Sequence, residues 1–271
     1  MKILCTGYKG FIGSYVKKLF PDAIGYDIKE TPEDNVLNEQ HLLHILKKNQ
    51  IETVVHLAAY VSASDSEKFP LAYIKNNIDG TASVIQACLK ARVKKIVYAS
   101  SSAAYEPTSS IYALTKYVSE LLLEYYKDQI QTVSLRIFNV YGQGSNPNYG
   151  RVIDEFIKGI KAKGEVTIYG DGNQTRDFIH AEDVVRSIQL AVKKDVPSGE
   201  VMDIGTGQTM AITTLAFLVG DLMNKRPKIN YAPARAEVKY SRANINKAKQ
   251  LLGFTAEIIL AQGLKELISL H

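Results

Sequence analysis

The first two thirds of the chain alternate short apolar runs, rich in β-branched residues, with longer segments in which apolar residues recur at helical spacing. The short runs predict strands at residues 2–6, 23–27, 53–58, 95–100 and 133–138. The longer segments predict helices at residues 10–19, 39–48, 78–91 and 112–127. Strands that alternate with helices are typical of βαβ units, so we predict an α/β fold with a doubly wound parallel sheet.

The helix predicted from Tyr112 has the clearest periodicity. Its apolar residues recur at i, i+3, i+4 and i+7, as in an amphipathic helix. They are Leu114, Tyr117, Val118, Leu121, Leu122 and Tyr125.

The pattern changes after about residue 142. Residues 142–150 are rich in Gly, Asn and Pro and predict a loop, which is followed by a helix near 152–161 and a strand at 166–169. We therefore expect a larger domain over residues 1–145 that also recruits roughly residues 175–205. A small C-terminal lobe would consist of residues 146–174 and 206–271.

Composition excludes several classes of protein. The 33 Lys and Arg against 28 Asp and Glu give a charge of +5 without any basic run, which does not favour nucleic-acid binding but suits a small anionic ligand. The two cysteines, Cys5 and Cys88, lack metal-ligand spacing and are interpreted as reduced core thiols, and no metal is expected. The N-terminus has no apolar signal segment and no run reaches the length of a membrane span, so a cytoplasmic protein is expected.

The first predicted strand leads directly into the sequence GYKGFIG, which places glycines at Gly7, Gly10 and Gly13 before a helix. Such glycines permit a tight turn, let backbone N–H groups approach a pyrophosphate and allow close packing of helix on strand. Asp27 ends the second predicted strand twenty residues after Gly7. A carboxylate there hydrogen-bonds the adenosine ribose and repels a 2′-phosphate, so the pattern predicts a Rossmann-type domain that binds NAD in preference to NADP. A tight turn without a ligand is the alternative, and Lys29 leaves NADP open.

Tyr112 is the one tyrosine of sixteen with a lysine four residues later, Lys116, and this spacing places both on one helix face. A phenol titrates near pH 10, so its use as a base at pH 7 needs help worth roughly 4 kcal/mol. A nearby ammonium and an oxidised nicotinamide can supply that help. A serine from the end of the preceding strand could orient the substrate oxygen. An aromatic–lysine pair on a helix surface is the structural alternative.

With these motifs the chain resembles an extended short-chain dehydrogenase/reductase of the sugar-nucleotide epimerase and dehydratase group, similar to UDP-glucose 4-epimerase. The resemblance covers nearly the whole chain. The segments that carry it are TGYKGFIG (6–13), VVHLAA (54–59), NNIDGT (76–81), VYASSSAAY (97–105), YALTK (112–116), LRIFNVYG (135–142), IYGDGNQTRDFIH (168–180) and DIGTG (203–207).

The resemblance implies a set of site residues and a small C-terminal lobe that binds the substrate. The implied catalytic residues are Ser101, Tyr112 and Lys116. The implied NAD-binding residues are Gly7, Gly10, Phe11, Ile12, Gly13, Asp27, Ile28, Asn35, Val36, Leu57, Ala58, Ala59, Asn77, Ser100, Tyr112, Lys116 and Phe138. The implied nucleotide-sugar ligands are Ser101, Ser102, Asn139, Val152, Tyr169, Arg176 and Arg235. A homodimer formed through the helices at 78–91 and 112–127 is also implied.

Within this group the residues after the catalytic serine help to separate the reactions. Dehydratases and decarboxylating relatives carry acidic residues at the positions of Ser102 or Ala103, and neither cysteine matches a reductase or 3,5-epimerase pair. A 4-epimerase needs only Tyr112 as base, Lys116, Ser101 and NAD as hydride carrier, so this reaction fits best. Other oxidoreductases or dehydratases on nucleotide sugars, and a non-catalytic NAD(P)-binding sensor, remain alternatives.

The chain also departs from the group. The segment between Ser101 and Tyr112 is much shorter than in such epimerases, so a loop that helps to cover the sugar is missing. Asn35 replaces the usual adenine-contacting Asp, and the segment at Arg235 is compressed. Tyr105 is expected to pack against or frame the pocket wall. The departures predict a smaller, more open sugar pocket or an unusual substrate.

Overall fold

A computed structural model describes residues 1–144, 152–234 and 238–270. The chain divides into two compact units. Unit 1 consists of Met1–Ile137, Val185–Asp203 and Asn246–Phe254, and unit 2 of Phe138–Val184, Ile204–Ile245 and Thr255–His271. Unit 1 includes residues 246–254, which sequence analysis assigned to the lobe; there the Arg186 guanidinium lies 5.1 Å from the centroid of the buried Phe254 ring.

Unit 1 contains a six-stranded sheet in the order β10-β5-β4-β3-β1-β2. The strands are β1 (Ile3–Thr6), β2 (Ile24–Tyr26), β3 (Thr53–His56), β4 (Lys95–Ser101), β5 (Gln131–Ile137) and β10 (Glu200–Ile204). The pairings of β2 with β1, β1 with β3, β3 with β4 and β4 with β5 are all parallel. The chain leaves β1 toward β2 and returns to β3 on the other side, and this reversal of strand order is where such sheets bind ligands. The predicted α/β fold is confirmed.

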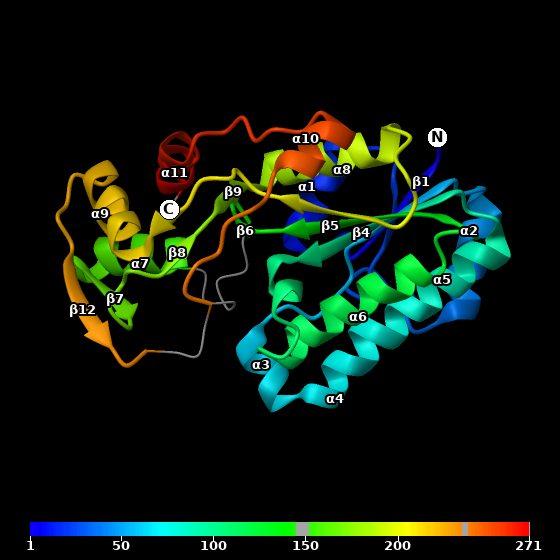
Figure 1. The fold of residues 1–271 in the computed structure, drawn as a ribbon, viewed down its shortest axis with the longest axis horizontal. Helices are drawn as coiled ribbons and strands as arrows, with labels where there is room; N and C mark the ends of the chain where they lie inside the picture. The colour runs from blue at the N-terminus through cyan, green and yellow to red at the C-terminus, as the bar shows by residue number, and fades with distance from the viewer. Residues whose placement is uncertain (145–151, 235–237, 271) are drawn as a thin grey trace. The chain divides into compact units, whose positions relative to one another are not determined.

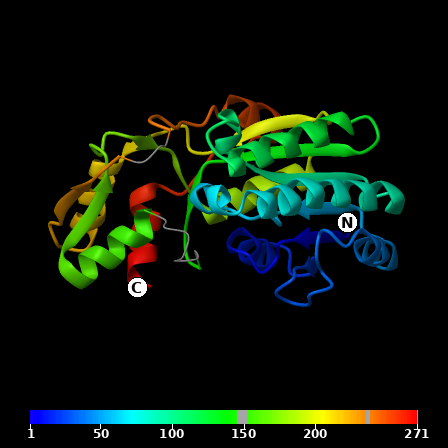
Figure 2. The same ribbon diagram turned by 90° about the horizontal axis from the view of Figure 1, so that it is seen from below.

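Helices cover both faces of this sheet, as Figure 1 shows. The helix α5 (Gly80–Ala91) lies beside α6 (Ile111–Tyr125) on one face, and α2 (Glu39–Asn49) packs against α5. Figure 2 shows the same layer from below. On the other face lie α1 (Phe11–Leu19) and α8 (Ala181–Lys193). The buried core between the α2–α5–α6 layer and the sheet includes Leu4, Leu46, Val54, Ile85, Ile96 and Leu123.

Three short helices before α5 escaped prediction. They are α3 (Ala63–Lys68), α4 (Pro70–Tyr73) and a π-helix at Ile74–Asp79. The first two are too short to develop an apolar period, and the π-helix lies just where the predicted helix 78–91 begins. A single π turn shifts the register of the helix, which changes the direction in which its side chains point.

The apolar stripe of α6 is not its most buried face. Leu114, Leu121 and Tyr125 are exposed, whereas Lys116 and Glu120 are 3% and 4% exposed. The other buried residues of α6 are Ala113, Thr115, Ser119 and Leu123. The polar members of this face have partners on the sheet or on neighbouring helices, so they can be buried without losing hydrogen bonds.

Unit 2 is built from two-stranded sheets and three helices. The parallel pairs are β6 (Asn139–Tyr141) with β9 (Phe178–His180), and β7 (Glu165–Tyr169) with β12 (Lys228–Ala232). An antiparallel pair joins β8 (Thr175–Arg176) and β11 (Met210–Ala211). The helices are α7 (Val152–Lys163), α9 (Ile212–Leu222) and α11 (Leu260–Ser269), and they share a core that includes Phe156, Ile157, Leu215, Val219 and Leu264.

A buried carboxylate fixes the loops of unit 2. The Asp177 carboxylate is fully buried and accepts backbone N–H groups of Thr206, Gly207 and Ala243 at 2.9, 2.8 and 3.2 Å, together with the Thr206 hydroxyl. A carboxylate with this many donors holds distant segments in one register. Among the described residues no helix combines the length and apolar character that crossing a membrane requires.

Candidate active site

The glycine loop between β1 and α1 has no room for side chains. Gly7 has φ +69°, and a Cβ added there would lie 2.7 Å from the backbone nitrogen of Ala58. A Cβ at Gly13 would lie 2.4 Å from the Gly7 carbonyl oxygen. The helix α1 begins with Gly10 as N-cap, and no side chain caps this end. Such a terminus could hold the pyrophosphate of NAD.

Asp27 follows β2 and is 8% exposed. Its carboxylate accepts the backbone N–H of Lys9 at 2.8 Å and that of Lys29 at 2.9 Å, one on each oxygen. Each oxygen keeps a lone pair for a ribose hydroxyl. The glycine loop and Asp27 are therefore held together by the protein itself, as an adenosine site requires.

The other predicted adenosine contacts follow along the chain. Ile28 is 49% exposed, and Val36 is buried. The Asn35 side-chain oxygen accepts the N–H of Leu37 at 2.9 Å. Asn35, which is predicted to contact adenine, thus forms a hydrogen bond within its own loop.

His56, at the end of β3, links the strand ends through hydrogen bonds whose directions can be assigned. The Thr81 hydroxyl donates to the Asn77 carbonyl at 2.6 Å, so it accepts from the Nε2–H of His56 at 3.1 Å. The Nδ1 atom then accepts from the Thr6 hydroxyl at 2.7 Å, and Thr6 accepts the N–H of Ala58. Burial lowers the pKa of His56 to about 3, with a smaller contribution from Lys116, so the imidazole is neutral.

These bonds fix the segment that contains Leu57, Ala58 and Ala59. Asn77, in the π-helix, also contacts the segment: its side chain accepts the N–H of Tyr60 at 2.8 Å and donates to the Tyr60 carbonyl at 3.1 Å. The same amide donates to the Thr115 hydroxyl of α6 at 3.0 Å. Asn77 thus connects the predicted cofactor wall to the helix that contains Tyr112.

Three side chains cap the start of α6. Two of them belong to α3, a helix that sequence analysis missed. The bonds run from the N–H of Ile111 to Glu67, from that of Tyr112 to Ser66, and from that of Ala113 to Ser110, at 2.9, 3.0 and 3.1 Å. Caps of this kind fix the first turn of a helix. The first turn of α6 contains Tyr112.

Lys116 lies one turn after Tyr112 and is buried. Its Nζ donates to the Ala99 carbonyl at 2.7 Å and lies 4.8 Å from the centroid of the Tyr98 ring. Burial lowers the pKa of Lys116 to about 7, against an opposing effect of the Glu120 carboxylate. At pH 7 about half of such lysines are charged, and the helix spacing places Lys116 one turn from Tyr112, where an ammonium favours a phenolate.

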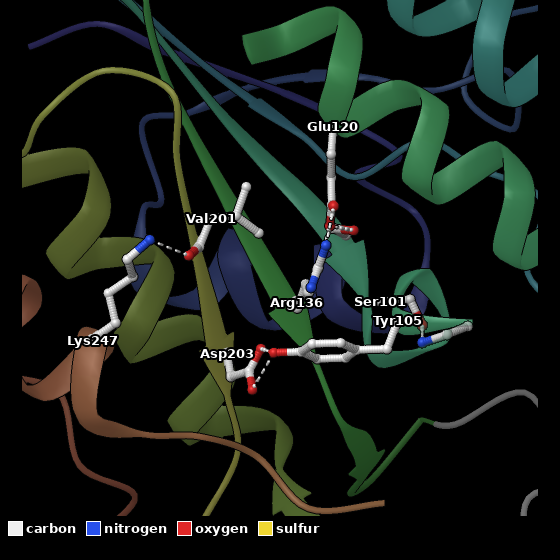
Figure 3. Close-up of polar contacts among 9 residues, drawn as sticks. Ser101, Tyr105, Glu120, Arg136, Val201, Asp203 and Lys247 are labelled. Atoms are coloured by element: carbon white, nitrogen blue, oxygen red, sulfur yellow. Dashed lines mark hydrogen bonds and ion pairs between the residues drawn. The ribbon is translucent and has the colours of Figure 1, made fainter. Parts of the chain in front are cut away.

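Ser101 ends β4 and caps a 3₁₀ turn, Ser102–Tyr105. Its Oγ accepts the N–H of Ala103 at 3.2 Å, and an O–H that accepts can still donate to a ligand. Tyr105 fixes the far end of the turn, because its hydroxyl donates to the two carboxylate oxygens of Asp203 at 2.9 and 3.0 Å (Figure 3).

The remaining predicted residues lie in several places. Ser100 is buried, and its hydroxyl donates to Glu120. Five of the predicted ligands belong to unit 2: Phe138, Asn139, Val152, Tyr169 and Arg176. Arg235 lies outside the described residues. The structure thus brings the predicted unit 1 residues to the carboxyl ends of β1 to β4, while the ligand roles of all these residues stay predictions.

Sequence analysis missed Ser66, Glu67 and Glu120. The signal for Glu120 was present, since Tyr112, Lys116 and Glu120 are spaced by four residues and share a helix face. No spacing in the sequence indicates that Ser66 or Glu67 caps α6.

Comparison with known proteins gives one family and many relatives. The model of the NAD dependent epimerase/dehydratase family matches residues 3–205. A putative UDP-glucose 4-epimerase of Methanocaldococcus jannaschii is 31% identical, over 98% of this chain and 97% of the relative. A UDP-N-acetyl-alpha-D-glucosaminuronate decarboxylase of Bacillus cytotoxicus is 29% identical, over 98% and 96%. The solved structure of MoeE5 in complex with UDP-glucuronic acid and NAD is 31% identical, with a TM-score of 0.90 and coverage of 99% and 98%.

Proposed function

Since the chain belongs to the NAD dependent epimerase/dehydratase family, we propose that it inverts the C4 hydroxyl of a nucleoside-diphosphate sugar, most simply UDP-glucose and UDP-galactose. The carrying observation is a buried Lys116 one turn from Tyr112, beside a serine-capped turn without a carboxylate. The family uses NAD, which supplies the hydride acceptor and donor when it is bound.

Three residues of unit 1 have separate roles in the proposed reaction. Tyr112 removes the proton from the C4 hydroxyl and later returns it. The Lys116 ammonium stabilises the phenolate, and the Ser101 hydroxyl donates to the substrate oxygen. The 4-keto sugar then turns over, so that reduction on its opposite face inverts C4.

The turn after Ser101 supports epimerisation over elimination or decarboxylation. Its residues Ser102, Ala103, Ala104 and Tyr105 offer a hydroxyl, two methyl groups and a phenol that donates to Asp203. Elimination of water across C5 and C6 requires a second proton-transfer group near the sugar. No side chain of this turn is a carboxylate.

The nucleotide-sugar contacts in this proposal come from unit 2. Asn139 would donate to or accept from the substrate, and Arg176 would bind the diphosphate through a charge-assisted contact. The Arg176 side chain donates to the Thr175 carbonyl at 2.9 Å through Nη1. Val152 and Tyr169 would line the nucleotide, and Arg235 would add a second cation.

A panel of sugars tests the reaction. The pure protein is incubated with catalytic NAD⁺ and UDP-, GDP- and dTDP-sugars, including UDP-glucuronic acid, and products are identified by NMR. We expect an inverted C4 centre without net NADH, and loss of turnover by at least a hundredfold in Tyr112→Phe. Loss of water or CO₂, or stoichiometric NADH, would refute epimerisation. The absence of any change, with unaltered NAD binding by Tyr112→Phe, would favour a non-catalytic sensor.

We also propose that the protein forms a homodimer. The exposed apolar residues of α6 form a stripe that nothing in unit 1 covers fully, and α5 lies beside it (Figure 1). Contiguous exposed apolar surface of this kind marks an interaction site. A second copy of the same stripe is the simplest partner, because a two-fold axis pairs it with itself.

A further inference from the structure

The buried face of α6 contains a second charged residue that the proposed reaction does not use. Tyr112, Lys116 and Glu120 follow one another at successive turns of the helix. Lys116 and Glu120 are both almost fully buried. A charge inside a protein is costly unless it is paired, so each needs a structural explanation.

Glu120 is held in one position. Its Oε1 accepts the Ser100 hydroxyl and the Nε–H of Arg136 at 2.9 Å, and its Oε2 accepts the Nη2–H of Arg136 at 2.7 Å (Figure 3). Two parallel bonds from one guanidinium are the strong, geometrically specific form of such a pair. The carboxylate can therefore neither rotate nor move away from the α6 face.

Arg136 is fixed in turn from the far side. The Tyr105 ring lies 4.3 Å from the guanidinium carbon, measured to the ring centroid, and the Tyr105 hydroxyl donates to Asp203. Figure 3 shows the side chains of Glu120, Arg136, Asp203 and Tyr105 converging from α6, β5, β10 and the 3₁₀ turn. The anchoring of Glu120 thus reaches across three strands of the sheet.

The charged and titratable groups around Lys116 can be named. From α6 they are Tyr112 and Glu120, from β4 Tyr98, from β3 His56, whose pKa Lys116 lowers, and from β5 the Arg136 cation that pairs with Glu120. Burial disfavours the ammonium, and Glu120 is the carboxylate that opposes this effect.

We propose that Glu120 is a positioning residue that keeps the Lys116 ammonium charged beside Tyr112, with Arg136 and Ser100 holding its carboxylate in place. The role rests on the proposed function, since a charged Lys116 matters only if Tyr112 acts as a base. A purely structural role explains the arrangement less well. Buried ion pairs of this kind add little stability and can often be replaced by apolar residues at no cost.

The test measures the titration of Lys116 directly. Full-length protein is labelled with ¹³C-lysine, the Cε shift is followed by NMR between pH 5 and 11, and Lys116→Arg assigns the signal. We expect Glu120→Gln to lower the pKa of Lys116 by about one unit, because a buried opposite charge one helix turn away favours the ammonium. The matched control is Glu124→Gln, one turn further along α6 in an exposed position, and it should leave the titration unchanged.

A second variant removes the risk that an unpaired Arg136 prevents folding. The double substitution Glu120→Gln/Arg136→Gln deletes both charges and should lower the pKa of Lys116 less than Glu120→Gln does, because loss of the Arg136 cation favours the ammonium. A folded Glu120→Gln variant whose Lys116 titrates as in the wild type, or a double variant in which the pKa of Lys116 is raised, would overturn the proposal. The measurement needs no sugar, so a protein that turns over no nucleotide sugar but shows this shift would refute the proposed reaction and leave only the electrostatic coupling of Glu120 to Lys116 established.

Discussion

At the scale of single residues, the loop after β1 depends on glycines, which have no Cβ. Gly7 combines a left-handed backbone with a contact that any Cβ would violate. Two separate costs therefore meet at this position: the strain of φ > 0 and the clash with the segment at Ala58. The second cost would also displace the backbone that is expected to approach the pyrophosphate.

A matched pair of glycines separates these costs. We expect Gly7→Ala to destabilise the protein by more than 2 kcal/mol and to weaken NAD binding at least tenfold. Gly164 has the same φ of +69° with nothing within 4 Å of an added Cβ, so Gly164→Ala should cost about 1 kcal/mol and spare NAD binding. Urea unfolding and NAD titration measure both. Equal effects of the two variants would contradict the close-contact explanation.

His56 shows how a buried neutral imidazole makes stability depend on pH. Its pKa is about 3 in the folded protein, below the ordinary value of 6.5. Between these values the unfolded chain binds more protons, so stability rises with pH and is lost as pH falls from 6.5 toward 3.

We therefore expect His56→Gln to flatten the dependence of unfolding free energy on pH between 4 and 6.5. The slope should fall by up to about 1.4 kcal/mol per pH unit, the value for one proton. The control is His44→Gln on α2, where the side chain is exposed. Urea unfolding at half-unit pH steps provides the measurement, and an unchanged slope in His56→Gln would show that His56 is not the group responsible.

At the scale of elements, α6 has buried polar residues, including the predicted catalytic Lys116, on one face and exposed apolar residues on the other. Caps from Ser66 and Glu67 of α3 fix its first turn, and the Asn77 amide holds it from the π-helix. A short connection to β4 suffices because these side chains, together with Ser110, fix the start of α6 at Ile111. The same arrangement leaves Leu121 and its apolar neighbours exposed.

Leu121 tests the proposed dimer. The side chain is 45% exposed, and Leu121→Glu should convert a dimer to a monomer, since a carboxylate buried in an interface without a partner is costly. Ile259→Glu in unit 2, at a residue 69% exposed, is the control and should leave the dimer intact. Light scattering after size exclusion measures the mass. A wild-type monomer, or a dimeric Leu121→Glu protein, would refute an interface through α6.

At the scale of the whole molecule, binding of NAD is linked to folding. The predicted contacts come from five loops that follow different strands, so NAD should bind the folded chain and not the unfolded chain. Asp27 already orients its carboxylate through two backbone N–H groups. The 2′-phosphate of NADP would be repelled by that carboxylate.

NAD at a hundred times its Kd should stabilise the protein by about 2.7 kcal/mol, a rise in Tm of roughly 5–10 °C. NADP at the same concentration should give a clearly smaller rise. In Asp27→Asn the difference between the two cofactors should shrink, because the repulsion is gone while the side chain keeps its size. Differential scanning calorimetry measures the shifts, and an equal response of the wild type to both cofactors would contradict the assigned role of Asp27.

The sequence by itself determined the α/β class, the family and five of the six strands of the central sheet, while β10 was not predicted. Apolar runs and helical periods are local, and the glycine loop and the Tyr112–Lys116 spacing each lie within one short segment. Tertiary structure alone decided which face of α6 is buried. The apolar pattern indicated the stripe with Leu121, but Lys116 and Glu120 are buried instead, with hydrogen-bonding partners on β4 and β5. Partners so distant in sequence leave no local signal, because a charged residue can be buried only where other segments of the fold provide its counter-charge or hydrogen-bonding partner.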